Sequence, residues 1–203
     1  MPSAHEDQSP DPGAGPDGRV WLITGASSGF GRAPAEAALA AGDTVVAAAR
    51  RSGAIVQLTS MGGRMSFAGV GGYSATKFAL EGLTEALAGE VAPHGIRVMT
   101  VEPGAFRISF AGGAALQQSA TRLDAYADTV GVFRTALPDT DGTQPGDPDR
   151  AAAAILEALD AEQTPLRLAL GSDAVDAIGE YLDTARTELS RWEAVGRGAD
   201  FGA

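Results

Sequence analysis

A short apolar run that leads directly into a glycine-rich turn restricts the fold of this chain more than any other feature. Residues Val20–Ile23 are all apolar, as in a strand that is buried on both faces. The turn 24–31 follows, and the alanine-rich stretch 29–41 reads as a helix that ends at Gly42. Glycine lets a pyrophosphate approach the backbone, and the free N–H groups at the start of a helix attract an anion. The order of strand, turn and helix therefore predicts a dinucleotide-binding site.

The rest of the chain repeats the alternation of strands and helices. Further strands are predicted at 44–49, 54–59, 96–101 and 166–170. Helices are predicted at 74–91, around 113–128, and at 149–161 and 173–194. This alternation indicates an α/β protein whose parallel sheet carries helices on both faces.

The domain organisation follows from where apolar residues begin. Residues 1–17 are mostly Pro, Gly, Asp and Ser, so we expect a disordered tail. Residues 18–203 are enough for a single domain with its own core.

Composition excludes several classes of function. The chain has no Cys, which removes disulfides, thiolate catalysis and sulfur-based zinc sites, and its two His make a metal site unexpected. Its net charge of −11 disfavours nucleic-acid binding. With neither a long apolar run nor a signal-peptide pattern, we expect a cytoplasmic protein that does not bind a membrane.

A tyrosine and the chain's only lysine are spaced as a catalytic pair. Tyr73 and Lys77 are four residues apart on a predicted helix, so their side chains share one face. A free phenol has a pKa near 10, and a fixed positive charge beside it favours the phenolate. Such a phenol can donate a proton to a carbonyl oxygen or accept one from an alcohol.

These motifs resemble those of the short-chain dehydrogenase/reductase family. The resemblance implies a Rossmann-like doubly wound parallel sheet and hydride transfer between a nicotinamide cofactor and a carbonyl or alcohol. It adds Ser60 to Tyr73 and Lys77 as the third catalytic residue, and it places Pro103 and Gly104 beside the nicotinamide. In the glycine-rich turn the implied cofactor contacts are Thr24, Gly25, Ser27, Ser28, Gly29, Phe30 and Gly31.

The cofactor and the substrate are only partly specified. The second predicted strand ends in Arg50 and Arg51, where the family resemblance and the positive charge favour the 2′-phosphate of NADP, with NAD as the alternative. Phe106, Phe110 and Phe133 suggest an apolar alcohol or ketone as substrate.

The chain departs from the family pattern in two cofactor-binding positions and in its centre. Ile108 stands where the family usually has Thr, and Pro34 falls inside the predicted cofactor helix. The resemblance also implies two strands, their helices and a catalytic Asn between Arg51 and 54–59, and none of them is present. The fourth strand of the family lies between the first and the fifth, so its loss predicts an unfilled slot about 4.8 Å wide.

The short link between the second and third predicted strands leaves three arrangements open. A strand of five or six residues is about 17–20 Å long, whereas a link from Arg50 to Gly53 spans about 14 Å. Either one strand melts, the strands pair differently, or another copy completes the sheet. The missing helix normally packs on 74–91 at the subunit interface, so assembly into a homo-oligomer is also left open.

Two functions are therefore compatible with the sequence. One is an NADP-dependent oxidoreductase that uses Ser60, Tyr73 and Lys77. The other is a non-catalytic remnant that binds a nucleotide weakly or binds only a partner chain.

Overall fold

The computed structural model describes residues 20–23, 44–45, 53–108 and 119–202. The predicted glycine-rich turn 24–31, the helix 29–41 with Pro34, the pair Arg50 and Arg51, Phe110 and the tail 1–17 lie outside the described residues.

Five parallel strands form one sheet in the order β2-β1-β3-β4-β5. The strands are β1 (Val20–Ile23), β2 (Thr44–Val45), β3 (Gly53–Leu58), β4 (Arg97–Pro103) and β5 (Arg167–Leu170). Four of them lie within two residues of their predicted bounds, which confirms the α/β class and the parallel sheet. The predicted strand 44–49 is observed as Thr44–Val45, and 46–49 lie outside the described residues.

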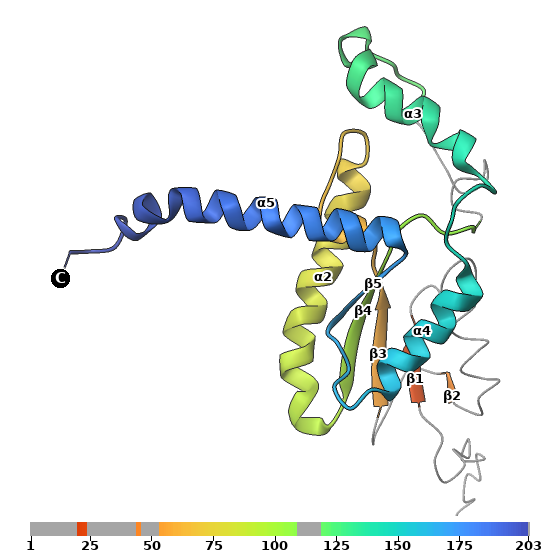
Figure 1. The fold of residues 1–203 in the computed structure, drawn as a ribbon, viewed down its shortest axis with the longest axis vertical. Helices are drawn as coiled ribbons and strands as arrows, with labels where there is room; N and C mark the ends of the chain where they lie inside the picture. The colour runs from red at the N-terminus through yellow and green to blue at the C-terminus, as the bar shows by residue number, and fades with distance from the viewer. Residues whose placement is uncertain (1–19, 24–43, 46–52, 109–118, 203) are drawn as a thin grey trace, which may run out of the picture.

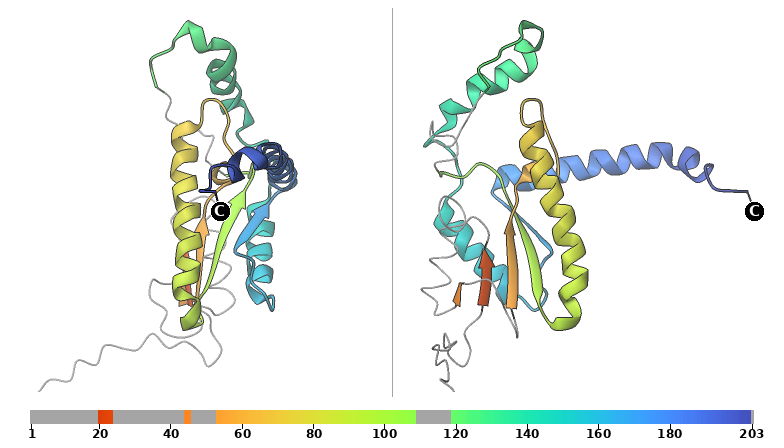
Figure 2. Two further views of the ribbon diagram at one scale, coloured as in Figure 1. Left: turned by 90° about the vertical axis from the view of Figure 1, so that its left-hand side faces the viewer. Right: turned by 180° about the vertical axis from the view of Figure 1, so that it is seen from behind.

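Helices cover both faces of the sheet, with α2 (Gly71–Val91) on one face and α4 (Pro148–Asp160) on the other (Figure 2). α4 begins as predicted: the Asp147 carboxylate accepts from the backbone N–H groups of Asp149 and Arg150, and Pro148 occupies the first turn. α5 (Ser172–Arg197) starts above β5 and projects from the body of the molecule (Figure 1). Short 3-10 helices are Met61–Gly63, Ala92–His94, Asp124–Tyr126 and Pro138–Thr140.

The prediction of a helix around 113–128 is wrong for residues 119–123 and correct from Asp124 onward, where the turns are 3-10 and π rather than α. Residues 119–123 are not helical; helical turns begin at Asp124, continue as a π-helix at Ala127–Gly131 and end in α3 (Val132–Ala136). The backbone N–H of Thr121 donates to the Ser119 hydroxyl, and the Arg134 guanidinium donates to the carbonyl oxygens of Ser119 and Thr121. These local bonds occupy groups that a helix would need.

The prediction of an unfilled slot in the sheet is also wrong. All four residues of β1 pair with β3, so no strand separates the two. Val20 lies level with both Thr44 and Gly53 on its two sides. Thr44 of β2 and Gly53 of β3 therefore lie about two strand spacings apart across the sheet, roughly 10 Å. A different pairing of the strands, one of the three open arrangements, is observed where β1 pairs with β3.

The main hydrophobic core lies between the sheet and α4. Alternate residues of β3 and β4 face it, including Val56, Met99 and Val101, all completely buried. Ile155 and Leu159 of α4 are completely buried in the same cluster. This core fixes the carboxyl ends of the strands, from which the expected site residues extend.

Candidate active site

Ser60 lies just beyond the carboxyl end of β3, at the start of the 3-10 turn Met61–Gly63. Its Oγ accepts a hydrogen bond from the Gly62 N–H at 3.1 Å and lies 3.5 Å from the Pro103 carbonyl oxygen, to which it can donate. The hydroxyl is therefore held between the ends of β3 and β4, and it keeps capacity for a further partner.

Tyr73 lies in the first turn of α2, and its ring faces Ser60 across Gly62. The point where a Cβ on Gly62 would lie is 3.2 Å from Cε1 of Tyr73 and 3.5 Å from Oγ of Ser60. The two side chains flank the same small volume. Tyr73 is 37% exposed.

Lys77 follows Tyr73 by one helical turn on the same face of α2. Its Nζ donates to the Leu58 carbonyl at 3.1 Å and lies 5.6 Å from the centroid of the Tyr73 ring. Burial lowers the pKa of Lys77 below its ordinary value of 10.5. The structure thus brings all three expected catalytic residues to one end of the sheet.

A buried polar network lies on the same face of α2 one turn further on. The Glu81 carboxylate accepts from the Thr59 hydroxyl at 2.5 Å, from Thr100 at 3.2 Å and from Arg167 at 3.2 Å. These bonds join α2 to the residue after β3, to the middle of β4 and to the first residue of β5. Glu81 was missed at the sequence level, although its position four residues after Lys77 was a usable signal.

A second buried carboxylate belongs to the same network. Glu102 of β4 lies 3.4 Å from the Arg64 guanidinium and 3.7 Å from Arg167. Burial and the nearby Glu81 raise the pKa of Glu102 above 4.5, against the opposing pull of the two arginines. An acid inside the apolar run of β4 was the sequence signal for this residue.

The turn after β4 holds the two residues expected beside the nicotinamide. The Gly104 N–H donates to the Leu170 carbonyl at 2.9 Å, which ties the turn to the end of β5. Ile108 packs against the main core, so this position offers an apolar side chain where the family pattern has a hydroxyl.

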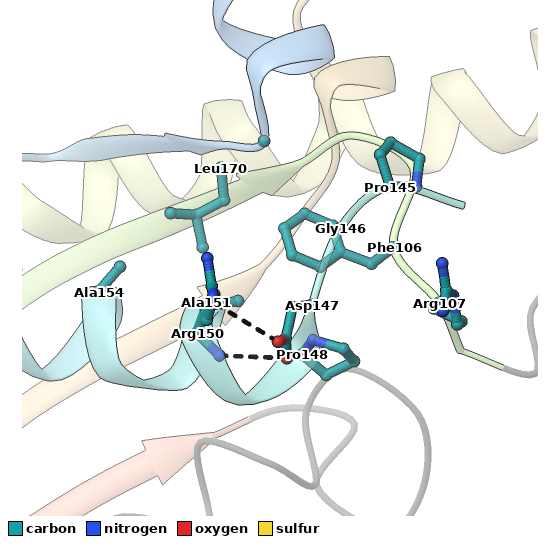
Figure 3. A pocket seen from close by; sticks show the side chains of 11 residues that line it. Phe106, Arg107, Pro145, Gly146, Asp147, Pro148, Arg150, Ala151, Ala154 and Leu170 are labelled. Carbon is teal, nitrogen blue, oxygen red and sulfur yellow. Dashed lines mark hydrogen bonds and ion pairs between the residues drawn. The ribbon is translucent and has the colours of Figure 1, made fainter. Parts of the chain in front are cut away.

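A cavity of about 620 Å³ opens beside this turn, next to the start of α4 (Figure 3). Its lining includes Phe106, Arg107, Gly146 and Leu170. Phe106 is buried, and the cavity lining does not include Ser60, Tyr73 or Lys77. Phe133 lies elsewhere: its ring centroid is 6.0 Å from that of Phe67, at the tip of the loop before α2.

Among the described residues, no group of three or more His, Cys, Asp or Glu side chains could bind a metal ion. None of the helices among these residues combines the length and apolarity that crossing a membrane would require.

Known proteins resemble the chain in sequence and in fold. A family model described as short chain dehydrogenase matches residues 48–118. A short-chain dehydrogenase of known structure from Streptomyces avermitilis is 38% identical with a TM-score of 0.75, over 91% of this chain and 100% of that one. A short chain dehydrogenase from Burkholderia cenocepacia, solved in complex with NADP, has a TM-score of 0.58 at 16% identity, over 86% of this chain and 97% of that one; it shares the fold.

Among curated proteins, Oxidoreductase BOA17 from Botryotinia fuckeliana is 34% identical over 70% of this chain. The chain spans about half the length of the curated relatives it matches, including 52% of that oxidoreductase. The agreement in sequence and fold establishes that this chain belongs to the short-chain dehydrogenase/reductase family of NAD(P)-dependent oxidoreductases.

Proposed function

We propose that this chain is an NADP-dependent oxidoreductase that interconverts an apolar ketone and the corresponding alcohol. The observation that carries the proposal is the grouping of Ser60, Tyr73 and Lys77. A hydroxyl and a phenol flank one small volume, and an ammonium lies one helical turn behind the phenol.

Each of the three side chains has a distinct role in ketone reduction. The Ser60 hydroxyl donates a hydrogen bond to the carbonyl oxygen and holds it beside Tyr73. The phenol of Tyr73 gives its proton to that oxygen, and the Lys77 ammonium stabilises the phenolate that remains. The cofactor supplies the hydride that reaches the carbonyl carbon. Alcohol oxidation reverses these transfers, with the phenolate of Tyr73 as the proton acceptor.

The described residues and the rest of the sequence together offer groups that would hold a nicotinamide cofactor. The Lys77 ammonium has three N–H groups and gives one to the Leu58 carbonyl, which leaves donors for a ribose hydroxyl. Pro103 and Gly104 would border the nicotinamide, and the turn from Thr24 to Gly31 would hold the pyrophosphate. Arg50 and Arg51 supply the positive charge that favours NADP over NAD.

A second candidate is a non-catalytic chain that binds a nucleotide weakly or binds only a partner chain. The direct pairing of β1 with β3 favours it, because the strand, the helix and the catalytic Asn that the family has in this region are absent. Titration with NADPH separates the two candidates. A micromolar or tighter complex contradicts the second candidate, and no binding contradicts the first.

Oxidation of NADPH, followed with a panel of apolar ketones, tests the chemistry. We expect Tyr73→Phe to lower kcat by at least about 100-fold, because the proton donor is lost while the ring remains. Tyr181→Phe on α5 is the matched control and should change nothing, since Tyr181 is 39% exposed and has none of the three proposed roles. Activity that survives Tyr73→Phe would refute the role of Tyr73.

A further inference from the structure

The turn expected to border the nicotinamide is bonded to the start of α5. The Ala105 N–H donates to Oδ2 of Asp173 at 2.7 Å, and the Gly104 N–H donates to the Leu170 carbonyl at 2.9 Å. Asp173 is the second residue of α5. Two successive amides of the turn thus bond to the segment that runs from β5 into α5, and one of the two acceptors is a carboxylate, which strengthens the bond.

Two glycines make room for this carboxylate. A Cβ on Gly104 would lie 2.3 Å from Oδ1 of Asp173, and a Cβ on Gly171 would lie 2.6 Å from the same atom. Neither separation is tolerable for a real Cβ. Gly171 also has a φ of +93°, in the region that favours glycine. The Asp173 carboxylate could rotate away from an added Cβ, but it would then lose its bond to Ala105.

We propose that Asp173 is a positioning residue of the cofactor site. Its carboxylate fixes the backbone of the Pro103–Gly104 turn against α5, and the glycine at 104 is required partly because this carboxylate occupies the space beside it. The inference rests on the proposed function, since it assumes that the turn borders a nicotinamide. It makes cofactor affinity depend on α5, a helix that carries none of the expected contacts.

A double-mutant cycle tests the coupling between the two residues. We expect Asp173→Ala and Gly104→Ala each to weaken NADPH binding about tenfold, as for the loss of one charge-assisted hydrogen bond. The double variant should bind about as well as either single variant, because the added methyl then meets no carboxylate. If the two losses of NADPH affinity instead multiply in the double variant, the inference is overturned.

Two further variants separate positioning from loss of fold. Asp173→Asn keeps an acceptor oxygen and should recover most of the affinity lost in Asp173→Ala. Asp176→Ala, an exposed acid on the next turn of the same helix, is the matched control and should bind NADPH like the unaltered chain. Thermal unfolding identifies any variant that fails to fold. If both variants are folded and Asp173→Asn loses as much NADPH affinity as Asp173→Ala, the proposed role of the acceptor oxygen at residue 173 is contradicted.

Hydrogen exchange on the protein without cofactor distinguishes this inference from the proposed function. The Ala105 amide should exchange faster in Asp173→Ala than in Asp176→Ala, because its acceptor is gone. Unchanged exchange contradicts the inference alone, and faster exchange with unchanged NADPH affinity contradicts the positioning role. If the unaltered chain binds no NADPH, the proposed function fails, and the cofactor part of this inference fails with it.

Discussion

The helices α2 and α4 cover opposite faces of the same sheet, yet they bury opposite kinds of side chain. α4 buries Ala151, Ala152, Ile155 and Leu159 against apolar residues of the strands. The buried residues of α2 are Ser74, Glu81 and Thr84. The α4 face is held by hydrophobic burial, whereas on the α2 face the buried Glu81 joins the helix to the strands by hydrogen bonds and an ion pair.

The difference has a consequence for the site, because the two kinds of interaction constrain geometry differently. Hydrophobic burial is non-directional, so it stabilises α4 without fixing its rotation closely. Hydrogen bonds need defined distances and angles. The bonds from Thr59, Thr100 and Arg167 to Glu81 therefore set the position of α2, and with it the position of Tyr73 and Lys77 relative to Ser60.

The largest expected loss of stability comes from the α4 face. Ile155→Ala removes a completely buried side chain from the main core and should lower the free energy of unfolding by roughly 2–5 kcal/mol. Urea denaturation measures this, with the exposed Glu157→Ala on the same helix as control. At a temperature where Ile155→Ala is fully folded, kcat should be close to that of the unaltered chain. A large fall in kcat would break the division between the two faces.

Glu81→Gln should have a smaller effect on stability and a larger one on turnover. The amide keeps the size of the side chain but removes the charge that faces Arg167, at a cost of roughly 1–3 kcal/mol. Because α2 is then less firmly placed, kcat should fall at temperatures where the variant is folded. The exposed Glu90→Gln on the same helix is the control. Unchanged kcat would show that this network only stabilises the fold.

The pH dependence of stability sharpens the comparison, since an acid with a perturbed pKa lies on the α2 face. Burial and Glu81 raise the pKa of Glu102, so the folded chain holds this proton to a higher pH than the unfolded chain does. The stability from this group is complete below about pH 4.5 and is lost as the pH rises through the raised pKa. Measured against pH, the melting temperature of the unaltered chain should fall as this stability is lost; Glu102→Gln should make that fall smaller, and Glu157→Gln should leave it unchanged. If the melting temperature of Glu102→Gln falls with pH as steeply as that of the unaltered chain, the raised pKa is contradicted.

The same contrast explains which parts of the molecule could be predicted from the sequence. The bounds of β1 and α4 follow from local patterns: an apolar run in one case, an acidic cap and a proline in the other. Tyr73 and Lys77 were identified by their types and spacing, and Ser60 by the family resemblance; the three lie together. The pairing of β1 with β3 could not be predicted, because strand neighbours are decided by long-range contacts rather than by local pattern.

The polar network and the Asp173 contact also escaped prediction, for a related reason. Their members come from segments far apart in the chain: Glu81 bonds to Arg167, and Asp173 bonds to Ala105. A buried acid is expected to find a partner, but the sequence does not say which one. Apolar residues of α2 also lie in the exposed part of the helix, among them Phe78 and Leu83.

Leu83 provides the prediction with the smallest expected effect. Leu83 is 61% exposed although it is apolar and lies on α2. If this face meets solvent, Leu83→Gln should change the free energy of unfolding by no more than about 0.5 kcal/mol, because an exposed substitution loses little buried area. The measurement is urea denaturation at two protein concentrations, with sedimentation of the unaltered chain alongside. A loss well above 1 kcal/mol that grows with protein concentration would mean that a second copy covers the face. The polar contacts of α2 would then be only the inner half of its packing, and the contrast with α4 would hold for the single chain but not for the assembly.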